Sequence, residues 1–159
     1  MAIKEGDKIP DATFMTMTAT GPKPMSTKEL FAGKKVALFA VPGAFTPTCS
    51  AQHLPGFLNN FDALKGKGVD TVACMAVNDA FVMAAWGKDR NVGEKILMLG
   101  DGNADFTKKI GLELDASKFG LGGRSKRFSM YVVDGVLKKL NVDEGSFEKT
   151  KAEVLLGQI

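Results

Sequence analysis

Residues 36–50, VALFAVPGAFTPTCS, join an apolar run to a segment that is typical of a helix start. Residues 36–41 carry no polar side chain, which predicts a central strand covered on both faces of a sheet. The hydroxyl of Thr46 is suited to cap the following helix, and Pro47 then takes the first helical position, where no amide is needed. Cys49 is therefore expected in the first helical turn.

The position of Cys49 makes it the leading candidate for a reactive group. Unpaired amides and the positive end of the helix macrodipole favour an anion in the first turn, so we expect this thiol to ionise more readily than a free cysteine. A lone cysteine is otherwise most often a small buried residue chosen for packing. On the local pattern alone, both the reactive and the structural interpretation of Cys49 stay open.

Length and composition predict one domain over residues 1–159. The chain is 45% hydrophobic and 25% charged, as in ordinary globular proteins. Its 21 basic and 18 acidic residues are scattered, so we expect no nucleic-acid partner and no membrane-surface partner. No run approaches the ~18 to 20 apolar residues of a spanning helix, and residues 1–7 lack the apolar core of a signal peptide. Together with only two cysteines, this predicts a cytoplasmic protein in a reducing compartment.

The first half of the chain contains clear helix and strand signals. Ser26 and Glu29 have the spacing of a capping box. The segments predicted before residue 69 are an edge strand or hairpin arm at 11–18, a turn at 21–24, a helix from 26 to 33, the central strand, and a helix that is kinked or broken near Pro55 and stops at residues 66–68.

The second half alternates in the same way and then ends in a hairpin. Its predicted segments are a strand at 69–77, a helix capped by Asn78, a strand at 96–99, a short acidic-capped helix at 101–110, a glycine-rich loop at 112–126, paired strands at 127–133 and 136–141, and a last helix capped by Ser146. The dipeptide Asp134-Gly135 between the paired strands is the strongest hairpin signal. The sequence therefore predicts an α/β fold, with a mixed central β-sheet flanked by helices on both faces.

Several side chains could share a site with Cys49. Thr46 lies three residues before it, so the hydroxyl and the sulfur can face one small cavity. The rings of Pro42 and Phe45 could keep bulk water from the sulfur. Arg127 opens a strand after the glycine-rich loop and could hold a thiolate through its permanently charged guanidinium, although such a residue is more often a solvated strand end.

His53 lies four residues after Cys49, on the same helix face, and could act as a general base as in cysteine hydrolases. No Asp or Asn is placed by the sequence to orient it, so a half-buried polar histidine is the commoner outcome. Two cysteines and one histidine cannot complete a zinc site at normal ligand spacing, so no metal is expected. Residues 120–126 fit neither the P-loop nor the dinucleotide-binding pattern and are expected to form a flexible loop.

Cys74 stands in the middle of a predicted strand between apolar neighbours. Burial there raises the pKa of a thiol and makes it inert, which is the expected role. The alternative is a resolving thiol for Cys49.

The run PGAFTPTCS at 42–50, extended by HLPGF at 53–57, resembles the active-site signature of the peroxiredoxins. The runs VACMAVNDAFVMAAW at 72–86 and KRFSMYVVDGVLKKLNV at 126–142 are similar to the type II, atypical class, related to plant type II and peroxiredoxin-5 groups, so the likeness covers nearly the whole chain. The resemblance implies a thioredoxin-like fold and a thiol peroxidase that needs no cofactor and reduces hydrogen peroxide and alkyl hydroperoxides.

The same resemblance assigns roles to four residues. Cys49 is implied as the peroxidatic cysteine, which attacks a peroxide oxygen and becomes a sulfenic acid. Thr46 is implied as its hydroxyl partner, Pro42 as the shield and Arg127 as the cationic partner. Most of the acceleration must then come from positioning and from charge stabilisation, since ionising an ordinary thiol fully gains at most ~30-fold.

The resemblance also bears on partners. Mammalian members carry a resolving cysteine near the C-terminus, and this sequence has no cysteine after Cys74. Cys74 matches the second cysteine of plant type II members, in which glutathione and glutaredoxin commonly act as reductants. The resemblance therefore implies reduction by glutathione and glutaredoxin, with a Cys49 to Cys74 disulfide and thioredoxin as the alternative. The class implies a homodimer, with Phe45, Phe81 and Trp86 as candidate contacts, although core packing is equally open for the last two. A slowly oxidised redox-sensing or binding protein and a cysteine hydrolase remain as other functions.

Overall fold

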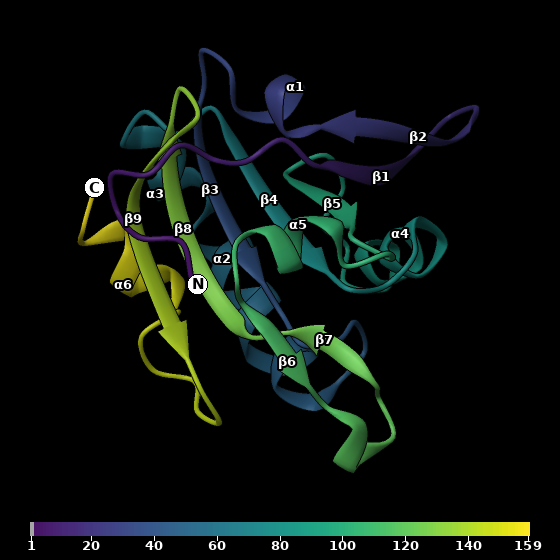
Figure 1. The fold of residues 1–159 in the computed structure, drawn as a ribbon. Helices are drawn as coiled ribbons and strands as arrows, with labels where there is room; N and C mark the ends of the chain where they lie inside the picture. The colour runs from purple at the N-terminus through teal and green to yellow at the C-terminus, as the bar shows by residue number, and fades with distance from the viewer. Residues whose placement is uncertain (1) are drawn as a thin grey trace.

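The computed structural model describes residues 2–159, in which a seven-stranded sheet lies between two sets of helices (Figure 1). The three parallel strands β3, β4 and β5 form its centre, and antiparallel strands flank them on both sides. In spatial order the strands are β2 (Gly21–Ser26), β1 (Thr13–Thr18), β5 (Ile96–Gly100), β4 (Thr71–Ala76), β3 (Lys35–Ala40), β8 (Arg127–Val133) and β9 (Val136–Asp143). The mixed sheet predicted from the sequence is present.

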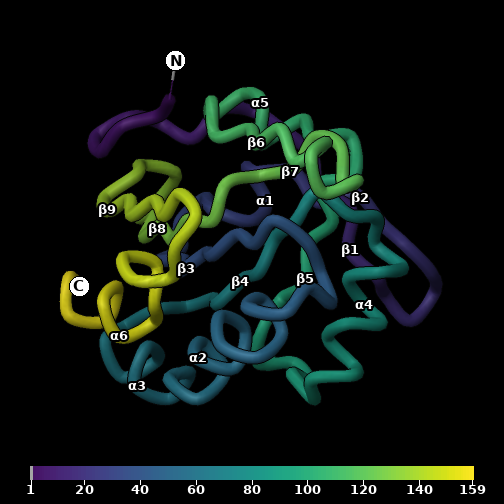
Figure 2. Tube along the Cα trace, turned by 90° about the horizontal axis from the view of Figure 1, so that it is seen from below, coloured from purple at the N-terminus to yellow at the C-terminus, as the bar shows by residue number. Residues whose placement is uncertain are grey.

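Helices cover both faces of this sheet, as predicted (Figure 2). One apolar core is formed with α2 (Leu54–Asn59), α3 (Phe61–Gly66), α4 (Ala80–Asp89) and α6 (Ala152–Leu156), and the other with α1 (Thr27–Phe31) and α5 (Asp105–Lys109). Strand β3 has neighbours on both edges and helices on both faces, so residues 36–40 are completely buried. This explains why its sequence is apolar without alternation.

The two hairpins illustrate a correct and a wrong prediction. Asp134 and Gly135 have φ angles of 48° and 76°, the left-handed conformations of a tight hairpin turn, and they connect β8 to β9 as expected. The turn predicted at 21–24 is instead part of strand β2, which pairs with β1. Its prolines at 22 and 24 are tolerated because β2 lies at the edge of the sheet.

Two helix starts also differ in their capping residues. The capping box of Ser26 and Glu29 is present at α1. Helix α4 is capped by Asp79, whose carboxylate accepts from the Val82 amide at 2.8 Å, and not by Asn78 as predicted. The side chain of Asn78 accepts from the Ala44 amide at 3.0 Å, so it ties the loop before Cys49 to the end of β4.

The irregularity predicted near Pro55 lies one turn earlier. A helix begins at Pro47, and residues Cys49–His53 form a π-turn in which the Leu54 amide donates to the Cys49 carbonyl. A proline lacks an amide, and its ring clashes with the carbonyl four residues back, so a wider turn before it relieves both problems. Helix α2 then continues to Asn59, and Asn60 separates it from α3.

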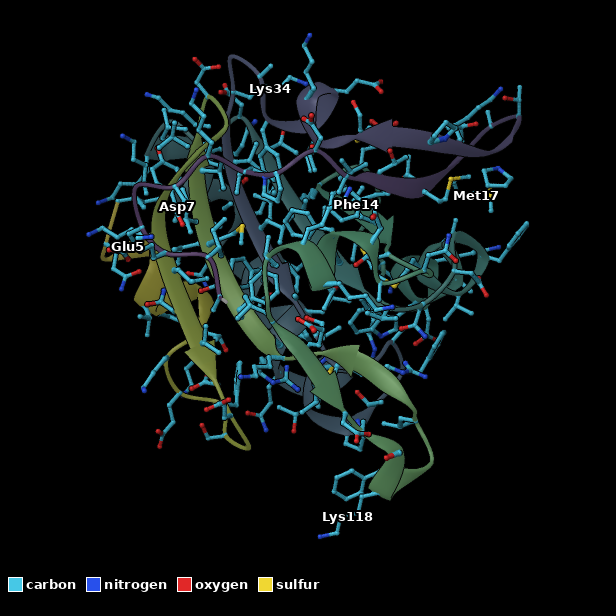
Figure 3. All side chains as sticks on the ribbon, viewed as in Figure 1. Glu5, Asp7, Phe14, Met17, Lys34 and Lys118 are labelled. Carbon is cyan, nitrogen blue, oxygen red and sulfur yellow. The ribbon has the colours of Figure 1, made fainter. Side chains whose placement is uncertain are left out.

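Three predictions for the second half of the chain need correction. The segment predicted as a glycine-rich loop contains a small two-stranded sheet of β6 (Glu113–Asp115) and β7 (Gly123–Ser125) with a short 3-10 turn, and Lys118 extends from its outer end (Figure 3). Helix α5 begins four residues after Asp101, whose carboxylate nevertheless accepts from two amides of its first turn. Ser146 caps no helix, because α6 begins only at Ala152.

Within residues 2–159, no helix is long and apolar enough to cross a membrane.

Candidate active site

Cys49 lies where the chain leaves the carboxyl end of β3 and turns into the helix, as the sequence predicts. Its side chain is only 1% exposed, and it packs into the core formed with α2, α4 and α6. The thiol is free. Burial alone would make this sulfur a packing residue, so its neighbours decide what it can do.

Arg127 is the decisive neighbour. It opens β8, which pairs with β3 so that Phe128 lies opposite Ala40 at the strand end nearest the helix start. Its Nη2 donates to the Cys49 sulfur at 3.1 Å, and the side chain is 8% exposed. The expectation of a solvated strand-end arginine is therefore wrong. Among residues 2–159, no carboxylate lies within 4.0 Å of the Arg127 guanidinium.

His53 receives the other arm of this guanidinium. Arg127 Nη1 lies 2.8 Å from His53 Nδ1, and His53 Nε2 lies 3.0 Å from the Thr150 carbonyl. Burial and then the Arg127 charge lower the pKa of His53 to about 3, so the ring is neutral. Because a carbonyl only accepts, the ring proton sits on Nε2, and Nδ1 accepts from Arg127. His53 is thus a partner of the arginine and not a base for the thiol.

Thr46 adopts a different bonding pattern from the one predicted. Its carbonyl accepts from the Ser50 amide at 2.9 Å, as at a helix start, but its hydroxyl caps no amide. The hydroxyl instead donates to the Gly43 carbonyl at 2.6 Å. With its proton engaged, the oxygen is left as an acceptor for any further group. A Cβ on Gly43 would lie 3.1 Å from both the Thr46 methyl and Arg124 Nη1, so a larger residue there would crowd this turn.

A cleft of ≈ 460 Å³ opens over the guanidinium. Most of its wall is apolar, and Pro42, half-buried, lies on it as a shielding residue would. The lining comprises Pro42, Thr48, Leu114, Ala116, Phe119, Leu121, Lys126, Arg127, Asp143, Glu144, Gly145, Ser146 and Phe147. Phe119, on the 3-10 turn between β6 and β7, is 78% exposed and was not singled out from the sequence.

Of the three aromatic residues predicted as candidate dimer contacts, two are exposed and one is buried. Phe45 and Phe81 are 52% and 64% exposed. Trp86 is fully buried, and its Nε1 donates to the Ser50 hydroxyl at 2.9 Å, next to Cys49 in the chain. Trp86 therefore belongs to the core, the alternative kept open for it, and only the two phenylalanines present surface.

Cys74 lies on β4 and is fully buried. Burial raises its pKa well above the ordinary value, and the nearby Cys49 charge acts in the same direction. A thiol that stays protonated is a poor nucleophile, which agrees with the expected inert role.

Sequence reasoning missed the segment after β9. Asp143 ends that strand and Thr150 supplies the carbonyl to His53, while the Phe147 ring lies 5.1 Å from the His53 ring and 5.7 Å from the guanidinium. Counting back from the predicted hairpin turn places residues 142–143 opposite Arg127, so the neighbourhood could have been found. No sequence pattern predicts the hydrogen bonds of the segment after β9.

The site thus holds the buried Cys49 sulfur beside the permanent positive charge of Arg127. Within residues 2–159, no carboxylate lies close enough to neutralise that charge. Such a site stabilises a thiolate, and equally an oxygen anion that forms beside it. The described residues contain no group of three or more His, Cys, Asp or Glu that could hold a metal ion.

Comparison with known proteins gives consistent matches. A family model described as Redoxin matches residues 4–156. The chain is 49% identical over 160 residues to Peroxiredoxin-2E, chloroplastic, of Arabidopsis thaliana, and the aligned region covers 98% of this chain and 68% of that protein. Reduced Prx3 of Vibrio vulnificus, solved in complex with H2O2, superposes with a TM-score of 0.94 at 53% identity over 98% of each chain. Peroxiredoxin 5 of Alvinella pompejana gives 0.85 at 38% identity, over 97% of this chain and 96% of that one.

Proposed function

This chain belongs to the Redoxin family as a thiol peroxidase of the type II peroxiredoxin class, with a thioredoxin-like fold, and from that premise we propose that Cys49 is its peroxidatic cysteine. The observation that carries this proposal is the 3.1 Å hydrogen bond from Arg127 to the Cys49 sulfur. It supplies a fixed positive charge where both the nucleophile and the leaving group of peroxide reduction are anionic.

The reaction begins with attack of the Cys49 thiolate on one peroxide oxygen. A sulfur–oxygen bond forms as the oxygen–oxygen bond breaks, and the sulfur loses two electrons. The leaving oxygen takes the electron pair as hydroxide or alkoxide and then a proton, which gives water or an alcohol. The protein keeps a sulfenic acid on Cys49.

Thr46 and Arg127 orient the peroxide in this step. The Thr46 hydroxyl already donates to Gly43, so its oxygen accepts from the O–H of the peroxide. The guanidinium donates toward the oxygens on which charge accumulates, and that charge is largest in the transition state. Pro42 limits the access of water at the mouth of the site.

Hydrogen peroxide is the first substrate proposed, and the Prx3 relative was solved in complex with H2O2. Alkyl hydroperoxides are the second. The apolar wall of the cleft beside Arg127 supports them, because an organic group there leaves water while the peroxide end reaches the guanidinium.

Glutathione and glutaredoxin are proposed to regenerate the thiol. One glutathione condenses with the sulfenic acid to a mixed disulfide and water, and a second thiol, from glutaredoxin or glutathione, then displaces Cys49 as a thiolate. The buried, protonated state of Cys74 supports this route over an internal disulfide served by thioredoxin. Peptide mapping under non-reducing conditions after one equivalent of peroxide tests it, and a Cys49–Cys74 bridge as the main product would overturn it.

A homodimer is proposed in which Phe45 and Phe81 contribute to the contact, because both are large apolar side chains with half or more of their surface exposed. Sedimentation of the reduced protein at micromolar concentration tests this, and a strict monomer would end the idea.

Rapid mixing with hydrogen peroxide tests the central proposal. Trp86 is the only tryptophan, and it bonds to the residue next to Cys49, so its fluorescence can follow oxidation. Cys49 should react orders of magnitude faster than a free thiol. A rate equal to that of a free thiol would leave the redox-sensing alternative.

A further inference from the structure

The carboxylate of Asp143 organises the segment that follows β9. It is buried, and it accepts five hydrogen bonds, all from that segment. The donors are the Ser146 hydroxyl at 3.2 Å, the amides of Glu148 at 3.0 Å, Lys149 at 3.1 Å and Thr150 at 2.9 Å, and the Thr150 hydroxyl at 2.8 Å. The segment is thus wrapped around one buried anion.

Thr150 connects Asp143 to His53 through hydrogen bonds. Its amide and hydroxyl both donate to Asp143, while its carbonyl accepts from His53 Nε2 at 3.0 Å. Holding the amide and the hydroxyl fixes the direction of the residue, and therefore the place from which the carbonyl meets the imidazole. The His53 ring is also enclosed by Phe39 and Phe57.

That carbonyl selects the tautomer of His53. With the proton on Nε2, Nδ1 is a lone pair 2.8 Å from Arg127 Nη1. If the Thr150 carbonyl moved away, the proton could shift to Nδ1 and would then confront an arginine N–H with another donor. The orientation of the guanidinium, whose other arm bonds Cys49, depends on which nitrogen is protonated.

Asp143 does not pair with the arginine directly. The two residues lie opposite each other in the β8–β9 register, yet their side chains are not within ion-pair distance, and all the bonds to the carboxylate come from the loop. Its negative charge is therefore satisfied by amides and hydroxyls, and the guanidinium charge remains available to the sulfur.

We propose that Asp143 is a positioning residue for Arg127, acting through the Thr150 carbonyl and the His53 tautomer to hold the guanidinium against Cys49. This rests on the proposed function of Cys49 and Arg127. It assigns the loop after β9 a part in peroxide reduction, although among the described residues only Arg127 has a side chain hydrogen-bonded to the sulfur.

Asp143→Asn tests the proposal with little change of shape. An amide places an NH2 where the carboxylate accepted, so some loop donors lose their acceptor and Thr150 is released. The rate of Cys49 oxidation by hydrogen peroxide should fall by ~10- to 100-fold, the effect of misplacing a group by about 1 Å. Glu148→Gln is the matched control, because it removes one negative charge from an exposed side chain of the same loop, and its rate should equal that of the wild type.

The same change in an Arg127→Ala background separates positioning from a general structural role. If Asp143 acts through the arginine, Asp143→Asn should lower the already slow rate by less than about twofold. Equal fold losses in both backgrounds would overturn the proposal, as would a wild-type rate in Asp143→Asn. A wild-type protein no faster than a free thiol would instead refute the proposed function itself.

Thr150→Val keeps the test decisive if Asp143→Asn does not fold. It removes one of the five donors and retains the Thr150 amide and carbonyl. We expect a smaller loss of about threefold to tenfold, which is also suppressed without Arg127. A wild-type rate, or a loss that persists in the Arg127→Ala background, would refute the inference.

Discussion

Arg127 donates from Nη1 to His53 Nδ1 at 2.8 Å, so an unprotonated imidazole nitrogen, and not a carboxylate, orients the guanidinium. A carboxylate would fix the arginine equally well, but it would also cancel much of its charge. The neutral ring directs one arm of the guanidinium and leaves the net positive charge to the sulfur on the other arm. The following predictions depend on this division of the guanidinium between two partners.

Arg127→Ala should slow the oxidation of Cys49 by about 10²- to 10³-fold, the usual cost of removing a donor that stabilises transition-state charge. Arg127→Lys should lie between this variant and the wild type, because an ammonium keeps the charge without the two-armed donor geometry. Stopped-flow tryptophan fluorescence measures the rates, and circular dichroism checks the fold. Arg90→Ala, at the exposed end of α4, is the control and should react normally. Unchanged oxidation in Arg127→Ala would remove that residue from the mechanism.

His53 should make the protein less stable as the pH falls from 7 to 5. Its folded pKa of about 3 lies below the ordinary 6.5, so the unfolded state binds a proton in this range and the folded state does not. This group alone should lower the free energy of unfolding by about 2 kcal/mol, and the loss should level off below pH 3. Asp143 adds no slope there, because its pKa changes from 3.8 to about 2 on folding and its contribution is lost only as the pH falls through that lower window.

Urea unfolding at pH 7 and pH 5 measures this dependence. His53→Gln is the informative comparison, because an amide can donate to Thr150 and accept from Arg127 but does not titrate. Its unfolding free energy should change by about 2 kcal/mol less over the same interval. An identical pH dependence in His53→Gln and in the wild type would contradict the assigned burial of a neutral imidazole.

Cys74→Ala should leave the rate of Cys49 oxidation within about twofold of the wild type, and turnover with glutaredoxin should persist. The side chain is buried and its raised pKa keeps it protonated, so its removal should cost stability and not chemistry. Alkylation followed by peptide mapping provides a second measurement. Cys74 should be modified only after denaturation, and rapid labelling of Cys74 in the native protein would show that the thiol is accessible after all.

Ser50→Ala should destabilise the protein by about 1 to 3 kcal/mol, because it leaves the buried Trp86 N–H without its acceptor. The fluorescence emission of the single tryptophan should change as well. Urea unfolding measures the stability, with Ser117→Ala on the exposed β6–β7 segment as a control expected within about 0.5 kcal/mol of the wild type. A Ser50→Ala protein as stable as the wild type would mean that another group or solvent reaches the indole.

The sequence was most informative where local chemistry and tertiary environment agree. The apolar run at 36–41 and the Asp134-Gly135 turn predicted β3 and the β8–β9 hairpin, because burial on both faces and a tight turn each leave a local signature. Strand β2 was missed because its prolines have the appearance of a turn, and only the unpaired edge of a finished sheet tolerates them.

In the candidate active site too, the sequence did not predict contacts that depend on tertiary structure. The sequence predicted Cys49 at the helix start and singled out Arg127, and the structure has the two side chains 3.1 Å apart, but the hydroxyl bond of Thr46 depends on the path of the loop at Gly43. The hydrogen bonds to Asp143 depend on the irregular backbone of residues 144–150, for which no periodic pattern exists.

The contact between Arg127 and Cys49 joins residues 78 positions apart, and it exists only when β8 has paired with β3. Pairing between strands so far apart in the sequence forms more slowly than local structure, and during synthesis Cys49 emerges well before Arg127 does. A nascent or unfolded chain therefore exposes no more than an ordinary cysteine to peroxide. Under the proposed function, Cys49 gains its reactivity only with the completed sheet, and a chain that is still folding keeps this thiol reduced.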